Sequence, residues 1–323
     1  MDSPSKVASS PGARPRPLAP AAAWRLVRPG FLWVTAAGVL LGSAIAAACG
    51  CGFDPLRAAA ALLLALAAHA AANAWNDHHD AVSGADALNP APLAPFTGGS
   101  RVIQQGQASA ADARRLALAL AALVVLGGLW LALRVGGVLV IIGLAGLLLG
   151  WAYSAPPLRL MARGLGELTV AAAWWLIVVG ADATQRSAWH VVPAVSAVPF
   201  ALLVANILLI NGVPDAAFDA RVAKRTLAVR LGPAGVAAVY TALALLAHGV
   251  LLLAWRAQIP PTTAWWGLAS APLALAAAAR LWRFVARGEP VTALRPAIGL
   301  TIGAALVHAL ALTAAFASVA LQR

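Results

Sequence analysis

Nine long apolar stretches recur along this chain of 323 residues and constrain its fold more than any other feature. A helix needs about 20 apolar residues to cross the hydrocarbon core of a bilayer. The stretches are rich in Ala and Leu and do not alternate with polar residues, which favours helices over barrel strands. They cover residues 31–50, 56–75, 113–133, 135–153, 165–181, 191–210, 233–255, 262–281 and 296–321. The sequence therefore predicts an all-α polytopic membrane protein with a nine-transmembrane-helix bundle.

The composition excludes the other broad classes of protein. Apolar residues make up 62% of the chain and charged residues only 11%, whereas soluble domains carry roughly 25% charged residues. Residues 1–23 are rich in Pro, Ala, Ser and Arg and lack the apolar core of a signal peptide, so they predict a disordered basic tail. Residues 24–323 then form one transmembrane domain. Cys49 and Cys51 have no other cysteine to pair with and are expected to be small packing residues without a disulfide framework.

The basic residues predict the orientation in the membrane. The chain has 23 Lys and Arg against 11 Asp and Glu, a net charge of +12. With the N-terminus inside, 18 basic residues fall on inner segments, and the outer segments hold only Arg57, Arg134, Arg186, Arg256 and Arg323. Positive charge concentrates on the cytoplasmic side, so the N-terminus is predicted inside and the C-terminus outside. These charges are interpreted as orientation signals facing lipid, and no nucleic-acid partner is expected.

Five of the 11 acidic residues form two clusters at equivalent helix ends. Asp77, Asp80 and Asp86 follow the second apolar stretch, and Asp215 and Asp219 follow the sixth. Both clusters fall on the predicted cytoplasmic side. The remaining acids are scattered: Asp2, Asp54, Asp112, Glu167, Asp182 and Glu289.

The spacing within each cluster predicts a site for a hard metal ion. If the helices continue past the membrane surface, Asn76, Asp77 and Asp80 share one face, as do Asp215 and Asp219. Like charges at this spacing repel unless a cation lies between them. Oxygen ligands without Cys favour Mg²⁺ or Mn²⁺, and Mg²⁺ commonly joins carboxylates to substrate phosphates. The predicted metal ligands are Asp77, Asp80, Asp86, Asp215 and Asp219. The alternative is that these acids cap helices or pair with nearby arginines.

Basic residues beside each cluster are candidates to bind a diphosphate. Arg101 follows the first cluster, and Arg221, Lys224 and Arg225 follow the second. Lys and Arg can neutralise phosphate oxygens that the metal does not reach. Gly98, Gly99 and Ser100 could offer backbone N–H groups to an anion. The alternatives are ordinary positive-inside charge and a flexible turn.

Five stretches of this sequence together resemble the membrane-embedded prenyltransferases of the UbiA superfamily. They are Arg28-Pro29, NDHHDAVSGAD (76–86), TGGSRVIQQG (97–106), YSAPPLRLMARGLGEL (153–168) and PDAAFDARVAKRTLAVRLG (214–232). The resemblance covers the chain from about residue 24 to 320. The paired NDxxD and DxxxD motifs are highly specific for this family when they occur between apolar spans. The pattern is most similar to the 1,4-dihydroxy-2-naphthoate polyprenyltransferase branch of menaquinone biosynthesis.

The resemblance implies Mg²⁺-dependent transfer of a polyprenyl group from polyprenyl diphosphate to an aromatic acceptor. It implies an enzyme of the cytoplasmic (inner) membrane with a cytoplasmic active site and no obligate protein partner. Two departures, Ala223 where the family has Gly and Pro214 where relatives often have Arg, leave the acceptor open. A 4-hydroxybenzoate-like acceptor is the alternative to the naphthoate.

The predicted site combines the clusters with several single residues. The catalytic candidates are Asn76, Asp77, Asp80, Asp215, Asp219 and Tyr153. The candidates for binding diphosphate or acceptor are Arg28, Asn73, Arg101, Arg159, Asn211, Arg221, Lys224 and Arg225. Tyr153 could face a carbocation or belong to an interfacial aromatic belt. A transporter would carry charged residues near the middle of its spans, and a structural protein has no need for matched Asp pairs, so both are weaker alternatives.

Overall fold

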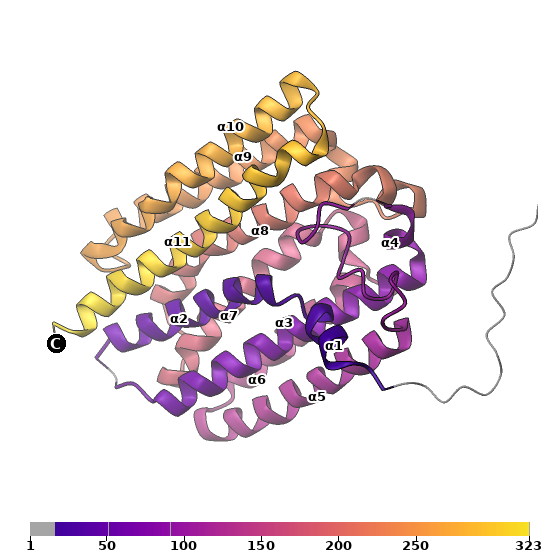
Figure 1. The fold of residues 1–323 in the computed structure, drawn as a ribbon. Coiled ribbons are helices and arrows are strands. Elements are labelled where there is room, and N and C mark those ends of the chain that lie inside the picture. The colour runs from indigo at the N-terminus through magenta and orange to yellow at the C-terminus, as the bar shows by residue number, and fades with distance from the viewer. Residues whose placement is uncertain (1–16, 51, 91, 323) are drawn as a thin grey trace, which may run out of the picture.

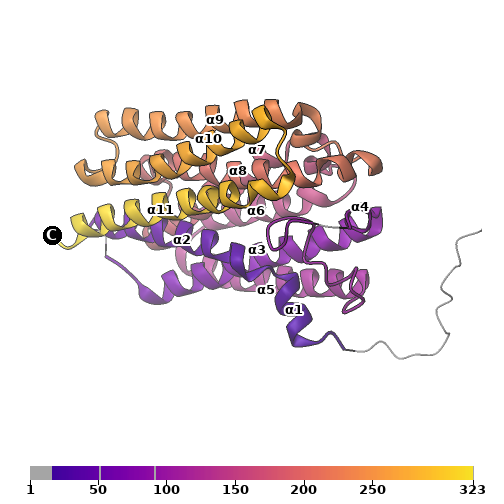
Figure 2. The same ribbon diagram turned by 45° about the horizontal axis from the view of Figure 1, so that its top comes forward.

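The computed structural model describes residues 17–50, 52–90 and 92–322, which form a bundle of long helices running side by side (Figures 1 and 2). Most of the predicted N-terminal tail lies outside these residues. The described part of the tail begins a short helix, α1 (Pro20–Leu26), so helical structure starts before residue 24. Within the described residues there is no strand.

Among the residues that the structure describes, eight helical segments are long and apolar enough to cross a membrane, and α6 is a shorter apolar helix. These segments correspond one to one with the nine predicted stretches, so the all-α transmembrane architecture is confirmed. The long helices are α2 (Pro29–Ala48), α3 (Pro55–Ser83), α5 (Ala110–Val135), α6 (Val138–Ser154), α7 (Gly166–Arg186), α8 (Val191–Asp219), α9 (Leu227–Arg256), α10 (Ala271–Arg287) and α11 (Arg295–Ala320). The eighth span also includes the 3₁₀ helix η3 (Thr262–Ser270) ahead of α10.

Two helices extend well past their predicted apolar stretches. Helix α3 continues through Asp77 and Asp80 to Ser83, and Gly84 follows as its C-cap with a φ of 78°, which suits glycine. Helix α8 continues through the second cluster to Asp219 and passes directly into η2 (Ala220–Val222). The predicted helical faces of both acidic motifs therefore exist in the structure.

Small residues let the central helices approach closely. Helix α8 packs against α7 and α9, and α2 packs against α7 and α11. At Gly42 a Cβ atom would lie only 2.2 Å from the carbonyl oxygen of Val178, so α2 and α7 meet backbone to backbone. Buried alanines fill much of the rest of the core. Close packing of small residues is typical of helix bundles in membranes.

The connection between α3 and α5 gathers at one end of the bundle. It contains α4 (Ala85–Leu88), and Figure 1 shows it near α1 and far from the C-terminus. At the opposite end, Cys49 is disulfide-bonded. The expectation that it is a simple packing residue is thus wrong. Cys51 lies outside the described residues.

Candidate active site

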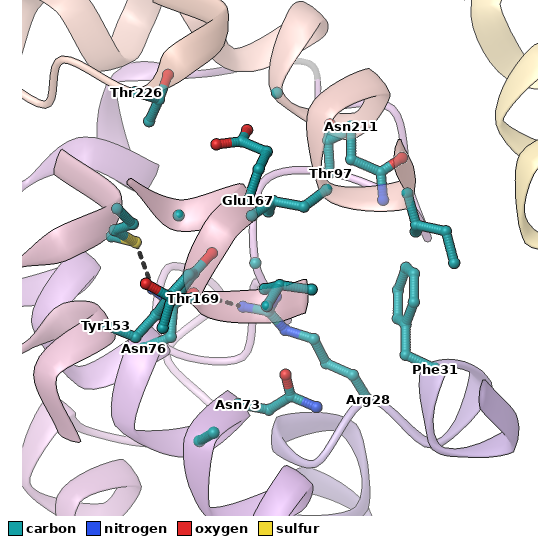
Figure 3. A pocket seen from close by; sticks show the side chains of 18 of the residues that line it. Arg28, Phe31, Asn73, Asn76, Thr97, Tyr153, Glu167, Thr169, Asn211 and Thr226 are labelled. Carbon is teal, nitrogen blue, oxygen red and sulfur yellow. Dashed lines mark hydrogen bonds between the residues drawn. The ribbon is translucent and has the colours of Figure 1, made fainter. Parts of the chain in front are cut away.

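A cavity of about 260 Å³ opens among α2, α3, α6, α7 and α8, at the end of the bundle that holds α4 (Figure 3). Four of the five clustered carboxylates line it: Asp80, Asp86, Asp215 and Asp219. Further along, its walls are apolar and aromatic, with Phe31, Val170, Trp174, Ile207 and Leu208. The two acidic motifs therefore share one polar mouth above an apolar interior. Asn89, which follows the first motif, donates a hydrogen bond to Asp215 of the second, 126 residues further along the chain.

Asp77 lies beneath this mouth rather than on the cavity wall. Its side chain is 3% exposed and forms an ion pair with Arg28, which does line the cavity. Its other oxygen accepts a hydrogen bond from the Ser100 N–H at 3.2 Å. Burial alone would lower the pKa of Arg28, but Asp77 and the neighbouring carboxylates outweigh burial and raise it. Arg28 therefore stays charged at the cavity wall.

Lys224 joins the two acidic motifs directly. Its ammonium lies 3.1 Å from both oxygens of Asp80 and 3.4 Å from Asp219. The lysine follows η2, and all three side chains are nearly buried. Burial opposes its charge, yet the two carboxylates raise the pKa of Lys224 above its usual value. A buried cation is thus already held between the carboxylates that the sequence predicted as metal ligands.

The segment 97–100 bonds to both acidic motifs through its backbone. The Gly98 N–H donates to Asp215 at 3.0 Å, and the Ser100 N–H donates to Asp77. Gly98 and Gly99 both have positive φ, 76° and 69°, which turns these N–H groups toward the carboxylates. In this structure the N–H groups of Gly98 and Ser100 bind protein carboxylates, whereas the sequence suggested that they bind a substrate anion.

Asp86 lies against the same turn. A Cβ atom on Gly99 would lie 2.5 Å from Oδ2 of Asp86 and 3.2 Å from Oδ1 of Asp77, so the two carboxylates approach each other across this glycine. Burial, and after it the charge of Asp80, raises the pKa of Asp86 to about 7. Neither Asp86 nor Asp215 takes part in an ion pair within the described ranges.

The predicted arginines separate into two groups. Arg28 lines the cavity, but Arg101, Arg159, Arg221 and Arg225 are not among the lining residues. Arg101 donates to the carbonyl oxygens of Asp86 and Asn89, at 2.5 and 3.0 Å, and so ties α4 to the glycine turn. Arg221 is exposed, with its guanidinium 5.7 Å from the Phe218 ring. In this conformation these four arginines do not line the cavity.

The predicted polar candidates on the helices mostly reach the cavity. Tyr153, Asn73, Asn76 and Asn211 all line it. Asn73 donates to the carbonyl oxygen of Val27 at 2.9 Å, and Asn76 donates to Ser154 at 3.2 Å and accepts from Arg28 at 3.4 Å. The Oδ1 atom of Asn211 is buried without a hydrogen-bond partner. Asn211 is therefore the member of this group whose carbonyl oxygen is left unpaired beside the cavity.

Sequence reasoning missed several polar residues of the cavity wall. They are His69, Thr97, Glu167, Thr169 and Thr226. His69 bonds Thr35 at 2.8 Å and meets the Trp174 ring edge-on, with ring centroids 4.9 Å apart. A signal was present: His69, Asn73, Asn76 and Asp80 recur every three or four residues, which places them on one helical face. Glu167 belongs to the YSAPPLRLMARGLGEL motif (153–168), but its position in the sequence groups it with the scattered acidic residues.

The oxygen donors of this mouth suit a hard divalent ion. Mg²⁺ binds through one or two carboxylates together with water and phosphate oxygens, so it needs no complete protein cage. The described residues contain no group of three or more acidic, His or Cys side chains arranged to hold a metal ion. Asp86 and Asp215 are lining carboxylates without a cationic partner among those residues. The donor set fits a Mg²⁺ ion that completes its coordination with substrate phosphates.

Comparisons with known proteins point to one family. Residues 31–297 match the UbiA prenyltransferase family. The 1,4-dihydroxy-2-naphthoate octaprenyltransferase of Mycobacterium tuberculosis is 32% identical over 262 residues, covering 81% of this chain and 85% of the relative. Among solved structures, a UbiA homolog from Aeropyrum pernix K1 has a TM-score of 0.68 at 16% identity, covering 87% and 96% of the two chains. A UbiA homolog from Archaeoglobus fulgidus, bound to GPP and Mg²⁺, has a TM-score of 0.57 at 19% identity, covering 91% and 99%.

Proposed function

The chain belongs to the UbiA prenyltransferase family, and from that membership we propose that it transfers a polyprenyl group from polyprenyl diphosphate to 1,4-dihydroxy-2-naphthoate in the biosynthesis of menaquinone. Relatives from two mycobacteria and from Bacillus subtilis carry the name of that activity at 27–32% identity. The one observation that carries the proposal is the cavity itself, in which paired acidic motifs and buried cations border an apolar, aromatic-lined interior.

Two cations of the cavity wall are placed to bind the diphosphate. Arg28 and Lys224 are held in position by Asp77, Asp80 and Asp219, and both stay charged despite burial. Their charges stabilise the negative charge that grows on the diphosphate as the allylic C–O bond breaks. When bound at the carboxylates, Mg²⁺ or Mn²⁺ supplies Lewis-acid stabilisation of the same leaving group. We propose Asp77, Asp80, Asp86, Asp215 and Asp219 as the residues that would hold it.

The inner part of the cavity protects the reacting carbon. Phe31, Val170, Trp174 and Ile207 keep water from an electron-poor allylic group. Aromatic faces such as those of Tyr153 and Trp174 stabilise a nearby cation through the ring quadrupole. The acceptor ring then attacks within the same apolar slot, and its planar shape suits the aromatic lining.

A transfer assay with defined substrates tests the proposal. Purified protein in lipid nanodiscs is incubated with Mg²⁺, a polyprenyl diphosphate and 1,4-dihydroxy-2-naphthoate, and pyrophosphate release and product mass are followed. We expect a prenylated naphthoquinol, loss of turnover with EDTA, and at least a 100-fold loss in Asp80→Ala and in Asp215→Ala. Arg287→Ala, which changes an exposed residue at the end of α10, is the control.

The same assay tests the prenyl-transfer reaction and the identity of the acceptor independently. If 4-hydroxybenzoate or another phenol reacts and the naphthoate does not, prenyl transfer stands and the acceptor assignment is wrong. If Asp80→Ala and Asp215→Ala turn over like the unchanged protein, the two-motif site is wrong.

We further propose that the protein lies in the cytoplasmic (inner) membrane with the cavity mouth and the N-terminus facing the cytoplasm. The excess of basic residues on the segments at that end supports this orientation. Polyprenyl diphosphate fits such a site because its charged head can stay at the interface while its tail enters the apolar cavity.

A further inference from the structure

Glu167 is a buried acid of the cavity wall that the proposed reaction has not yet used. It lies in the first turn of α7, is 9% exposed and lines the cavity. Within the part of the chain that the structure describes, it forms no ion pair and bonds to no other side chain. The chain has only one other glutamate, Glu289.

The close-up view shows the Glu167 carboxylate extending into the cavity, on the side where Thr226 lies (Figure 3). The two cations that line the cavity are engaged with other carboxylates: Arg28 binds Asp77, and Lys224 binds Asp80 and Asp219. Glu167 is thus available to a group that enters the cavity.

The surroundings of Glu167 suit a flat aromatic ring that bears a hydroxyl group. Glu167, Val170 and Trp174 are spaced by three and four residues, so they form one stripe of α7 along the cavity. Leu208 and Asn211 face the same cavity from α8. The Oδ1 of Asn211 is buried without a partner. A slot with apolar walls and a carboxylate acceptor at Glu167 complements a ligand with an O–H donor.

We propose that Glu167 accepts the hydroxyl proton of the aromatic acceptor during prenyl transfer; this inference rests on the proposed function. As the allylic C–O bond breaks, its electron pair leaves with the diphosphate. A ring carbon forms the new C–C bond, and the hydroxyl O–H proton passes to the Glu167 carboxylate. This gives a neutral ketone form of the ring.

Rearomatisation restores the glutamate. The substituted ring carbon releases its own proton to a diphosphate oxygen, and the ketone oxygen takes back the proton held by Glu167. The sum is one C–O bond broken, one C–C bond formed and one proton transferred to diphosphate. Removing the hydroxyl proton raises the electron density of the ring at the moment of attack, which is how a general base speeds this step.

A purely structural role for Glu167 predicts different behaviour. An acid in the first turn of a helix stabilises that helix through its dipole. Replacement by glutamine would then lower the thermal stability, and would affect diphosphate binding and turnover together.

The test compares Glu167→Gln with Glu289→Gln, which changes the only other glutamate, located beyond α10. For each protein, kcat and KM for the acceptor are measured across pH. The Kd of an unreactive polyprenyl thiodiphosphate is measured with Mg²⁺, and the Tm is recorded. We expect at least a 100-fold lower kcat in Glu167→Gln, loss of the rise in kcat with pH, and a Kd within twofold. Glu289→Gln should match the unchanged protein, and Glu167→Asp should recover part of the rate.

An acceptor whose reacting hydroxyl is methylated gives an independent measurement. It has no proton to donate, so the unchanged protein and Glu167→Gln should prenylate it at similarly low rates. The inference is overturned if Glu167→Gln keeps kcat within threefold, or if its loss of rate comes with an unchanged pH profile and a lower Tm. If the unchanged protein prenylates no aromatic acceptor, the proposed function itself fails.

Discussion

Gly99 shows how a single missing side chain shapes the site. Its φ is 69°, and a Cβ atom there would lie 2.5 Å from the Asp86 carboxylate. Gly106 in the same connection has nearly the same φ, 68°, but a Cβ atom there would meet nothing within 4 Å. Alanine substitutions at these two glycines therefore distinguish the cost of backbone strain from the effect of contact with the acidic side chains.

Gly99→Ala should lower turnover by about tenfold or more, because displaced carboxylates misplace the bound diphosphate. Gly106→Ala carries the same conformational cost, about 1–2 kcal/mol, and should retain turnover. The measurement is kcat for prenyl transfer beside the Tm of each variant. Equal kcat in the two variants would show that the closeness of Gly99 to Asp86 is not needed.

The raised pKa of Asp86 predicts how pH affects metal binding. Its pKa of about 7 lies above the value of roughly 4 expected in an unfolded chain. Between these values the folded protein holds a proton that the unfolded chain has released. In metal-free protein this group therefore stabilises the fold less as pH rises toward 7.

Mg²⁺ needs the ionised carboxylate, so it should raise the Tm more at pH 8 than at pH 6. Thermal unfolding of the purified protein with and without Mg²⁺ at both pH values measures this. In Asp86→Asn the difference between the two pH values should shrink. An equal gain in Tm at both pH values in the unchanged protein would contradict the assignment.

Close contact between α2 and α7 holds the wall of the cavity. Both helices supply lining residues, and Gly42 is where their backbones meet. A Cβ atom on Gly42 would lie 2.2 Å from the Val178 carbonyl oxygen and 2.8 Å from the Ala181 Cβ. Any side chain there must push the helices apart.

Gly42→Ala should therefore destabilise the protein by about 1–3 kcal/mol. Gly30→Ala in the same helix is the matched control, since its Cβ would meet nothing within 4 Å and alanine favours helix. Thermal unfolding in a fixed detergent compares the two. A Tm for Gly42→Ala equal to that of the control would mean that the helices separate at no cost.

At the scale of the whole molecule, the fold was predictable because apolar length alone selects membrane-spanning helices. The two acidic motifs were predictable as partners because each follows an apolar stretch on the same predicted side of the membrane. The counter-ions were harder to predict. Lys224 was one of three neighbouring basic residues, and only the turn after η2 decides that it, and not Arg221 or Arg225, enters the cavity. Ala223 in this turn has a φ of 56°, in the left-handed region that favours glycine.

The orientation of the molecule is a prediction with a direct test. A reporter that fluoresces only in the cytoplasm is fused to the C-terminus, and in a second protein it is inserted between α10 and α11. Because basic residues gather at the end that holds α4, the C-terminal fusion should stay dark and the inserted reporter should fluoresce. The reverse pattern would place the cavity mouth on the other side of the membrane.

The position of Lys224 between Asp80 and Asp219 has a thermodynamic consequence. A magnesium ion that bound alone would compete with the ammonium group for these carboxylates. A diphosphate bound beside Lys224 would give the ammonium group a new partner and free the carboxylates for the ion. Each ligand would then raise the affinity for the other, and linkage would require the factor to be the same in both directions. This arrangement would favour the complete magnesium–diphosphate pair over either component alone.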